Sequence, residues 1–365
     1  MKIRAVRTLC FAQPMIPIHA RSFAGALELV LTVVEADDGS EGYSLARSHG
    51  GQSGSVIANQ IDASLRALVL GRDVADRAAM WDAMAALEPP GYVSVFAISA
   101  LDVALWDLAG RLQGVPVASL CGDRRQSMRA YASSTHHATV DAYVADLQAA
   151  LALGFTAYKV HPFYEATRDI VLAGALRDAA GPHVRLMLDA AKRYGPNDAL
   201  RVGEALQALD YHWYEEPLPQ HDWAAYRRLR DALPHIPVIG GETLPGLHPG
   251  IANALDAQAY AAVLCDVYWK GGITGCLKTI ALCEARGVPV ASHHGASASM
   301  NLANLHVLCG ASDVEMIEVL VPQEPYHYGL RDYLRVDPAG MVRLPTVPGL
   351  GGEPDWAYIE AHRTV

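Results

Sequence analysis

Side chains that can bind a metal or transfer protons recur through the sequence, each at the end of a short apolar run. Lys159 and His161 end one such run, and later runs end at nearly even intervals in Asp189, Glu215, Glu242, Asp266, His293 and Glu318. If these runs are parallel strands of one barrel, their carboxyl ends meet at a single mouth. The spacing therefore predicts one site assembled from many strands.

The first constellation consists of the carboxylates Asp189, Glu215 and Glu242. Three carboxylates in one cleft repel each other, and a dication relieves this repulsion. Oxygen-only ligands suit Mg²⁺, so we expect a magnesium site here. The alternative is that these residues are helix caps or surface salt bridges in strand–helix loops. Three successive strands make that alternative weaker, because carboxylates are rarely buried without partners.

Lys159 and His161 lie two residues apart, so on a strand both side chains point to one face. Pro162 favours an extended conformation for His161, as at a strand end. A lysine beside a metal and another cation can have a lowered pKa and act as a base. The alternatives are a salt bridge from Lys159 to one of the carboxylates, and a purely structural role for His161.

Asp266 and His293 end neighbouring runs. A carboxylate behind a histidine fixes its tautomer and stabilises its protonated form. His294 follows directly, and alternation should place the two histidines on opposite faces. Glu318 can donate to an oxyanion in its protonated form if nearby charge raises its pKa. The alternative for Glu318 is a salt bridge to a basic barrel residue.

The elements that must position these residues follow a strict strand–helix alternation from residue 128 onwards. The predicted strands are Met128–Ala132, Ala157–His161, Arg185–Asp189, Trp213–Glu215, Val238–Glu242, Ala262–Asp266, Val290–His293 and Met316–Leu320. The predicted helices between them are Val140–Leu153, Arg168–Ala180, Asn197–Leu209, Asp222–Ala232, His248–Leu255, Thr274–Arg286 and Ser299–Leu308. This pattern favours a closed parallel barrel over a flat doubly wound sheet.

Residues 1–125 have a different pattern. Strand-like runs at Lys2–Phe11, Leu27–Glu35 and Gly42–Leu45 precede helical stretches at Val56–Leu70, Asp76–Leu87 and Ser94–Gln113. The irregular segment 14–25, with His19 and Arg21, has the length of a lid or binding loop. We therefore predict an α/β protein: an N-terminal α+β capping domain (1–125), a modified TIM barrel (β/α)7β (126–322) and a C-terminal segment (323–365) that returns to the capping domain.

Composition narrows the class of protein. The 365 residues carry a net charge of −10, whereas a nucleic-acid binder usually has a basic surplus. No window is apolar enough to span a bilayer, and the N-terminus lacks the features of a signal peptide, so we expect a cytoplasmic protein without nucleic-acid or membrane partners. The six cysteines form no C-x-x-C motif, which argues against zinc ribbons and thioredoxin-like chemistry.

The motifs together resemble the enolase superfamily, in its mandelate racemase and muconate lactonizing enzyme branch. They are LMLD, WYEEPL, IGGET, CDVYWKGGITG, VASHH and EMIE, which contain in turn Asp189, Glu215, Glu242, Asp266, His293 and Glu318. The resemblance covers essentially the whole chain. It implies Mg²⁺ bound by the first three residues, a His293–Asp266 dyad and a homo-oligomer.

Two positions depart from the family pattern. Lys159 and His161 match the family's Lys-x-Lys motif, with histidine in the second place. Ala191 stands where the family usually has asparagine, and we expect Lys192 to fill that space. His19, Arg21 and His49, in the capping loops, are the other expected substrate contacts.

The resemblance and the residues together predict removal of the proton next to the carboxylate of a small hydroxy acid, most simply a sugar acid. Lys159 or His161 would take the proton, while Mg²⁺ and Glu318 share the charge of the enediolate. His293 would then protonate a departing β-hydroxyl, which makes the chain an acid-sugar dehydratase. The alternatives are a racemase or epimerase, a cycloisomerase acting on a lactone or anhydro sugar and, from another class, a catalytically silent binding or scaffold protein.

Overall fold

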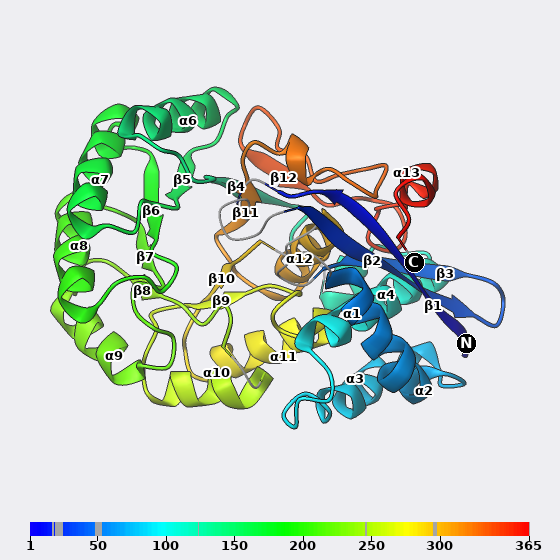
Figure 1. The fold of residues 1–365 in the computed structure, drawn as a ribbon. Coiled ribbons are helices and arrows are strands. Elements are labelled where there is room, and N and C mark those ends of the chain that lie inside the picture. The colour runs from blue at the N-terminus through cyan, green and yellow to red at the C-terminus, as the bar shows by residue number, and fades with distance from the viewer. Residues whose placement is uncertain are drawn as a thin grey trace.

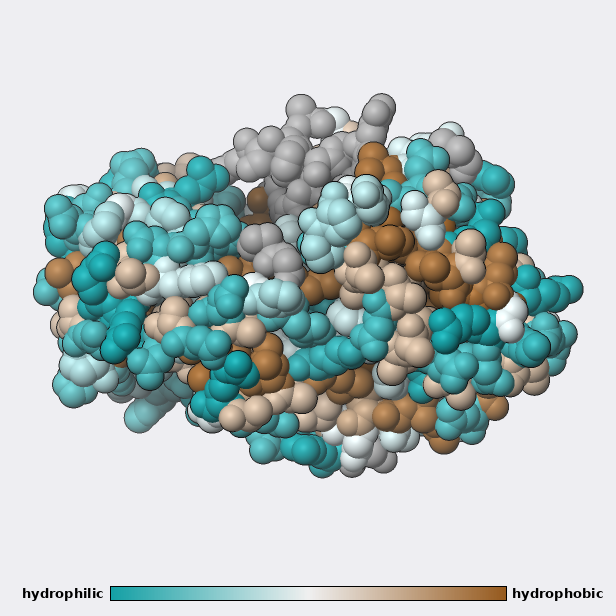
Figure 2. Space-filling model, turned by 90° about the horizontal axis from the view of Figure 1, so that it is seen from below, coloured by the Kyte–Doolittle hydropathy of each residue, from teal (hydrophilic) through white to brown (hydrophobic). Residues whose placement is uncertain are grey.

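The structure, a computed structural model, describes residues 1–16, 18, 25–47, 53–122, 124–244, 247–294 and 298–364. It consists of a barrel, on the left in Figure 1, and a smaller domain of N-terminal residues packed against its side. Seen from below, the barrel side of the surface is mostly hydrophilic, and hydrophobic residues gather over the smaller domain (Figure 2).

The barrel is built from parallel strands in chain order. The strands are β4 (Ser127–Ser133), β5 (Ala157–Val160), β6 (Arg185–Asp189), β7 (Trp213–Glu215), β8 (Val238–Ile239), β9 (Val263–Cys265), β10 (Val290–Ser292) and β11 (Met316–Leu320). Ladders join β11-β4-β5-β6-β7-β8 and β10-β9, and a bridge from Gly240 to Val263 links the two sets. Between β10 and β11 the backbone N–H of Glu318 donates to Ser292 Oγ at 3.2 Å. The predicted closed barrel is confirmed.

Helices cover the outside of the barrel between successive strands (Figure 1). They are α6 (Val140–Ala152), α7 (Ala166–Ala180), α8 (Pro196–Ala208), α9 (Trp223–Ala232), α10 (Leu247–Asp256), α11 (Gly272–Glu284) and α12 (Ala298–Ala311). Their starts are set locally: Thr139 and Asp222 accept hydrogen bonds from the first turns of α6 and α9, as N-cap residues do. The expected helices therefore form, with bounds shifted by a few residues.

A layer of apolar side chains fills the barrel interior beneath the mouth. It contains Tyr131, Ala157, Met187, Trp213, Ile239, Leu264 and Met316, all buried. Met187, Trp213, Leu264 and Met316 each precede a predicted site residue by two positions. Since side chains two apart on a strand share a face, this packed layer directs the site residues inward, one level closer to the mouth.

The N-terminal domain is an antiparallel sheet with helices against it. Its elements are β1 (Ile3–Pro14), β2 (Ala26–Ala36), β3 (Glu41–Ala46), α1 (Ser53–Gln60), α2 (Arg66–Val69), α3 (Arg77–Ala85), α4 (Val95–Gln113) and α5 (Val117–Cys121). The single helix expected at Val56–Leu70 is instead two α-helical pieces joined by a π-helical turn at Ile61–Leu65. Helix α4 ends at Gly114, whose φ of 68° is the left-handed conformation of a helix C-cap.

Buried polar contacts attach this domain to the barrel at α11 and the loop before it. Asp102 accepts from the backbone N–H and the hydroxyl of Thr274, at 2.9 and 2.7 Å. The indole N–H of Trp106 donates to the same hydroxyl at 2.8 Å, and that of Trp81 donates to Gly271 O. Because buried polar groups need hydrogen-bond partners, these contacts fix the β9–α11 loop relative to the capping domain.

The C-terminal segment contacts both the barrel and the N-terminal domain. Strand β12 (Met341–Arg343) pairs antiparallel with β4, and α13 (Trp356–Ala361) follows. Beyond α13 the backbone N–H of Thr364 donates to Cys10 O at 2.9 Å, which places this end beside β1. Within the described ranges, no helix has the length and apolar character that crossing a membrane requires.

Candidate active site

The structure gathers the predicted catalytic and metal-binding residues at the mouth of the barrel. Most of their side chains are buried, and those of Glu242 and His293 are partly exposed. One network of ion pairs links five of them: Lys159, His161, Asp189, Glu215 and Glu318. A further pair joins Glu242 to His293. The strand ends thus converge as the sequence predicts.

Lys159 lies at the centre of the network. Its Nζ is 2.9 Å from Glu215 Oε1, 2.9 Å from Glu318 Oε1 and 3.9 Å from Asp189 Oδ2. Burial alone lowers the pKa of this lysine, but the surrounding carboxylates raise it well above its ordinary value. These contacts form the salt bridge that was the alternative for Lys159 and favour its charged ammonium form, and its role as a base stays a prediction.

His161 is held with one ring nitrogen facing the site. Its Nδ1 lies 2.7 Å from Ser134 O. Because a carbonyl can only accept, Nδ1 carries a proton and donates to it. Nε2 of His161 lies 3.1 Å from Asp189 Oδ2. The backbone N–H of His161 donates to Ser134 Oγ, and the hydroxyl of Tyr143 donates to His161 O. Neighbours outside the site therefore fix both the tautomer and the orientation of His161.

His293 and Asp266 lie together as the predicted dyad. Nδ1 of His293 is 2.7 Å from Asp266 Oδ2, and the other Asp266 oxygen accepts from the backbone N–H groups of Tyr268 and Trp269. Nε2 of His293 faces Glu242 Oε1 at 3.4 Å. Although burial lowers the pKa of His293, the charges of Glu242 and Asp266 raise it to about 10.

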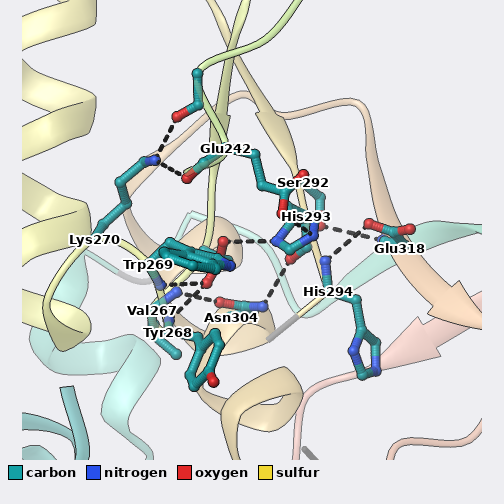
Figure 3. Close-up of polar contacts among 12 residues, drawn as sticks. Glu242, Val267, Tyr268, Trp269, Lys270, Ser292, His293, His294, Asn304 and Glu318 are labelled. Carbon is teal, nitrogen blue, oxygen red and sulfur yellow. Dashed lines mark hydrogen bonds and ion pairs between the residues drawn. The ribbon is translucent and has the colours of Figure 1, made fainter. Parts of the chain in front are cut away.

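His294 points away from His293 (Figure 3), as alternation predicts. Its ring packs against Tyr326, with 5.9 Å between the ring centroids, and burial lowers its pKa to about 3. Its backbone N–H donates to Glu318 Oε2 at 2.8 Å. The structure thus assigns His293 to the mouth and His294 to the packing behind it.

Glu318 does not have the raised pKa that a protonated donor requires. Burial raises its pKa, but Lys159 and His293 together lower it to about 2. The Lys159 contact at 2.9 Å is the salt bridge to a basic barrel residue that was the alternative for Glu318, and it favours the ionised carboxylate over the protonated donor. The attraction of the nearby ammonium group stabilises the ionised carboxylate. This stabilisation exceeds the cost of keeping the charge in buried surroundings.

The carboxylates Asp189, Glu215 and Glu242 have the chemistry of a Mg²⁺ site. They offer only oxygen ligands. Burial raises the pKa of Glu215 well above its ordinary value, which a bound cation would counteract. Among the residues that the structure describes, no three His, Cys, Asp or Glu side chains are already grouped around a metal position. Glu215 is instead paired with Lys159, and Glu242 with His293. The donor set fits Mg²⁺, and the ligand assignment stays a prediction.

Glu216 is a site residue that the sequence analysis did not single out, although it stands in the WYEEPL motif. Its buried carboxylate accepts from the backbone N–H groups of Gly241 and Glu242, at 3.0 and 3.1 Å. Nζ of Lys192 is 2.5 Å from Glu216 Oε2 and 3.9 Å from Glu242 Oε2. Ala191 and Lys192 both have positive φ, 44° and 65°. Such backbone strain is common at functional sites.

The remaining predicted substrate contacts, His19, Arg21 and His49, lie outside the described residues. Lys192 lies in the site, where it faces the Glu216 and Glu242 carboxylates. Its contact with substrate stays a prediction.

Two protein-family models match this chain and together cover most of it. Residues 3–122 match the N-terminal domain of the mandelate racemase / muconate lactonizing enzyme family, and residues 142–358 match the enolase C-terminal domain-like family. The chain belongs to the enolase superfamily, in its mandelate racemase and muconate lactonizing enzyme branch.

Its relatives include enzymes of two reaction classes. D-galactarolactone cycloisomerase of Agrobacterium fabrum is 29% identical, with 97% of this chain and 96% of the relative covered. 3,6-anhydro-alpha-L-galactonate cycloisomerase of Streptomyces coelicolor is 30% identical, with 96% of each covered. The crystal structure of D-glucarate dehydratase from Agrobacterium tumefaciens complexed with magnesium is 30% identical, with a TM-score of 0.89 over the whole of both chains. The chain is thus an enzyme whose relatives are sugar-acid dehydratases and cycloisomerases.

Proposed function

We propose that this enzyme catalyses a Mg²⁺-dependent β-elimination on an acid sugar, most simply the dehydration of a sugar acid. The observation that carries the proposal is the placement of two histidines around the carboxylate row. His161 lies beside Asp189 at one end of the row, at 3.1 Å, and His293 lies beside Glu242 at the other end, at 3.4 Å. A substrate bound against the row therefore has an acid–base group on each side.

The substrate carboxylate would bind where Asp189, Glu215 and Glu242 face the mouth. Mg²⁺ held by these residues would polarise that carboxylate and acidify the neighbouring C–H bond. Lys159 keeps a fixed positive charge among the carboxylates and stabilises the negative charge that develops on the substrate. Glu318, ion-paired with Lys159 at 2.9 Å, holds this ammonium group in place.

His161 would remove the α-proton through Nε2. Its Nδ1 is committed to the carbonyl of Ser134, so Nε2 is the nitrogen that can exchange a proton with substrate. The electron pair of the broken C–H bond then forms the carbon–carbon double bond as the β-oxygen departs. His293 donates a proton to that oxygen, since Asp266, 2.7 Å from Nδ1, stabilises its imidazolium form. The products are water and an enol, which tautomerises to a 2-keto-3-deoxy acid.

The unlike environments of the two histidines favour elimination over racemisation. His161 is hydrogen-bonded to a neutral carbonyl and His293 to a carboxylate, so one is suited to accept a proton and the other to donate one. A racemase needs two groups that can exchange roles. The arrangement therefore supports separate steps at the α- and β-positions.

A second candidate is cycloisomerisation, in which the departing oxygen belongs to a lactone or anhydro ring and stays attached to the product. The full-length similarity to the A. fabrum and S. coelicolor cycloisomerases supports this candidate. It uses the same proton removal by His161 and the same protonation by His293.

The test is a panel of aldonates, aldarates, their lactones and 3,6-anhydro acids, incubated with enzyme and Mg²⁺ in D₂O and followed by NMR. Water loss from an open-chain acid establishes the dehydratase, and ring opening of a lactone or anhydro acid establishes the cycloisomerase. Epimerisation with α-deuteration of the retained substrate, and no elimination on any member, would overturn the proposal.

A further inference from the structure

Lys270 is a buried lysine beside the site to which the proposed mechanism assigns no role. It follows β9, the residue is 2% exposed, and its Nζ lies 2.6 Å from Gly241 O and 2.6 Å from Glu242 O. Figure 3 shows the side chain reaching across to the Glu242 segment, away from the His293 ring. Hydrogen bonds from an ammonium group to carbonyls are stronger than those between neutral groups.

The Gly241–Glu242 segment is held from both sides. Its two carbonyls accept from Lys270, and its two N–H groups donate to Glu216 Oε1 at 3.0 and 3.1 Å. Gly241 has a φ of 86°, in the left-handed region, so the chain has left the extended conformation here. Lys270 and Glu216 thus satisfy all four polar backbone groups of this pair.

The expected metal ligands differ in how the backbone supports them. Asp189 is the last residue of β6 and Glu215 the last of β7, so the sheet itself fixes both. Strand β8 ends at Ile239, three residues before Glu242. Among the residues that the structure describes, the β8 ladder and the Gly240–Val263 bridge both end before Glu242, so the bonds from Lys270 and Glu216 take the place of sheet pairing there.

We propose that Lys270 is a positioning residue that fixes Glu242 for metal binding. Lys270 follows Asp266 by four residues, and its backbone N–H donates to Asp266 O at 3.1 Å. The same loop therefore carries the partner of His293 and the lysine that binds the Glu242 segment, so one element holds both neighbours at this end of the carboxylate row. This inference rests on the proposed function, in which Glu242 binds Mg²⁺.

The test measures Mg²⁺ binding by isothermal titration calorimetry on the full chain after chelator treatment. Lys270→Met removes the ammonium group, and we expect the Kd for Mg²⁺ to rise by about 10–100-fold, as for other outer partners of metal ligands. Lys270→Arg keeps N–H donors and should recover part of the affinity. Lys278→Met is the matched control: Lys278 lies on α11, where its ammonium group pairs with Asp82 of the capping domain, and the variant should bind Mg²⁺ like the natural chain.

Glu242→Gln separates the two ways in which this inference can fail. If Glu242→Gln weakens Mg²⁺ binding and Lys270→Met does not, Lys270 has no positioning role and the metal site stands. If Glu242→Gln binds Mg²⁺ normally, the ligand assignment fails, and the role of Lys270 fails with it. A lowered Tm of Lys270→Met with an unchanged Kd shows a merely structural lysine. Where Lys270→Met does not fold, Lys270→Gln replaces it: a folded variant with a raised Kd for Mg²⁺ supports the positioning role, and one with the natural Kd overturns it.

Discussion

Nδ1 of His293 lies 2.7 Å from Oδ2 of Asp266, and this carboxylate is itself held by the backbone N–H groups that follow it. The ring is therefore fixed in one orientation, with Nδ1 on Asp266 and Nε2 facing Glu242 at the mouth. A histidine supported in this way suits one proton transfer at a defined position. Removal of the α-proton and loss of the β-oxygen can therefore be measured separately.

His293→Asn should separate proton removal from elimination. In the proposed mechanism His161 acts at the α-carbon, so the variant should still exchange the α-proton of substrate with D₂O. Elimination should fall by roughly 10²–10⁴-fold, the usual contribution of a general acid. NMR in D₂O measures both rates in one sample. Loss of exchange and elimination to the same degree would contradict the assignment of separate roles.

Removal of Mg²⁺ should abolish activity reversibly. Chelator treatment followed by dialysis should give an inactive enzyme, and added Mg²⁺ should restore the rate. Glu215→Gln should remain inactive at any Mg²⁺ concentration, because it removes one of the proposed metal ligands and the carboxylate that is paired with Lys159. Glu284→Gln, at an exposed position of α11, is the control with the same chemical change. Full activity after exhaustive chelation would contradict the metal-dependent mechanism.

His306 should make the protein less stable in acid. Burial lowers its pKa from 6.5 to about 4, so between these values the unfolded chain binds a proton that the folded chain does not. Stability should therefore fall as the pH drops from 6.5 to 4, by about 3 kcal/mol for this residue. His306→Gln can keep the bonds to Ala118 N and Leu350 O without titrating.

Urea unfolding at pH 7 and pH 4 measures this effect as the difference between the natural chain and His306→Gln. The variant should lose less stability on acidification. His235→Gln, at an exposed histidine, should follow the natural chain. Identical pH dependence of His306→Gln and the natural chain would show that His306 is protonated equally in both states.

Two glycine substitutions should change stability in opposite directions. A Cβ at Gly272 would lie 2.3 Å from Asp102 Oδ2, and the φ there is 91°, which is strained for any other residue. Gly272→Ala should therefore destabilise the fold by roughly 2–5 kcal/mol. Gly174 lies within α7 with open space around it, so Gly174→Ala should stabilise by about 0.5–1 kcal/mol. Thermal unfolding measures both, and equal Tm values for the two variants would contradict the tight contact at Asp102.

Alternation in the sequence predicted the barrel and the residues at its mouth because both depend on local geometry. A period of two along a strand fixes which side chains face inward. Met187 with Asp189 and Leu264 with Asp266 show the two inward levels directly. The same rule separated His293 from His294. Helix Val56–Leu70 was predicted less well, since nothing in its amphipathic pattern signals the π-helical turn at Ile61–Leu65.

Charge states depended on the tertiary structure. Whether Lys159 is a base or a fixed cation depends on how many carboxylates lie beside it, and they come from three other strands. Glu318 is ionised for the same reason. The roles of Glu216 and Lys270 arise from contacts with a backbone segment between them, which no spacing in the sequence encodes.

The sequence by itself determined which residues reach the mouth of the barrel, because strand periodicity and strand order are properties of the chain. Only the tertiary structure decided which partners and which electrostatic surroundings each residue has there. Electrostatic and hydrogen-bond energies depend on distances between atoms far apart in the chain, and those distances exist only once the barrel has closed.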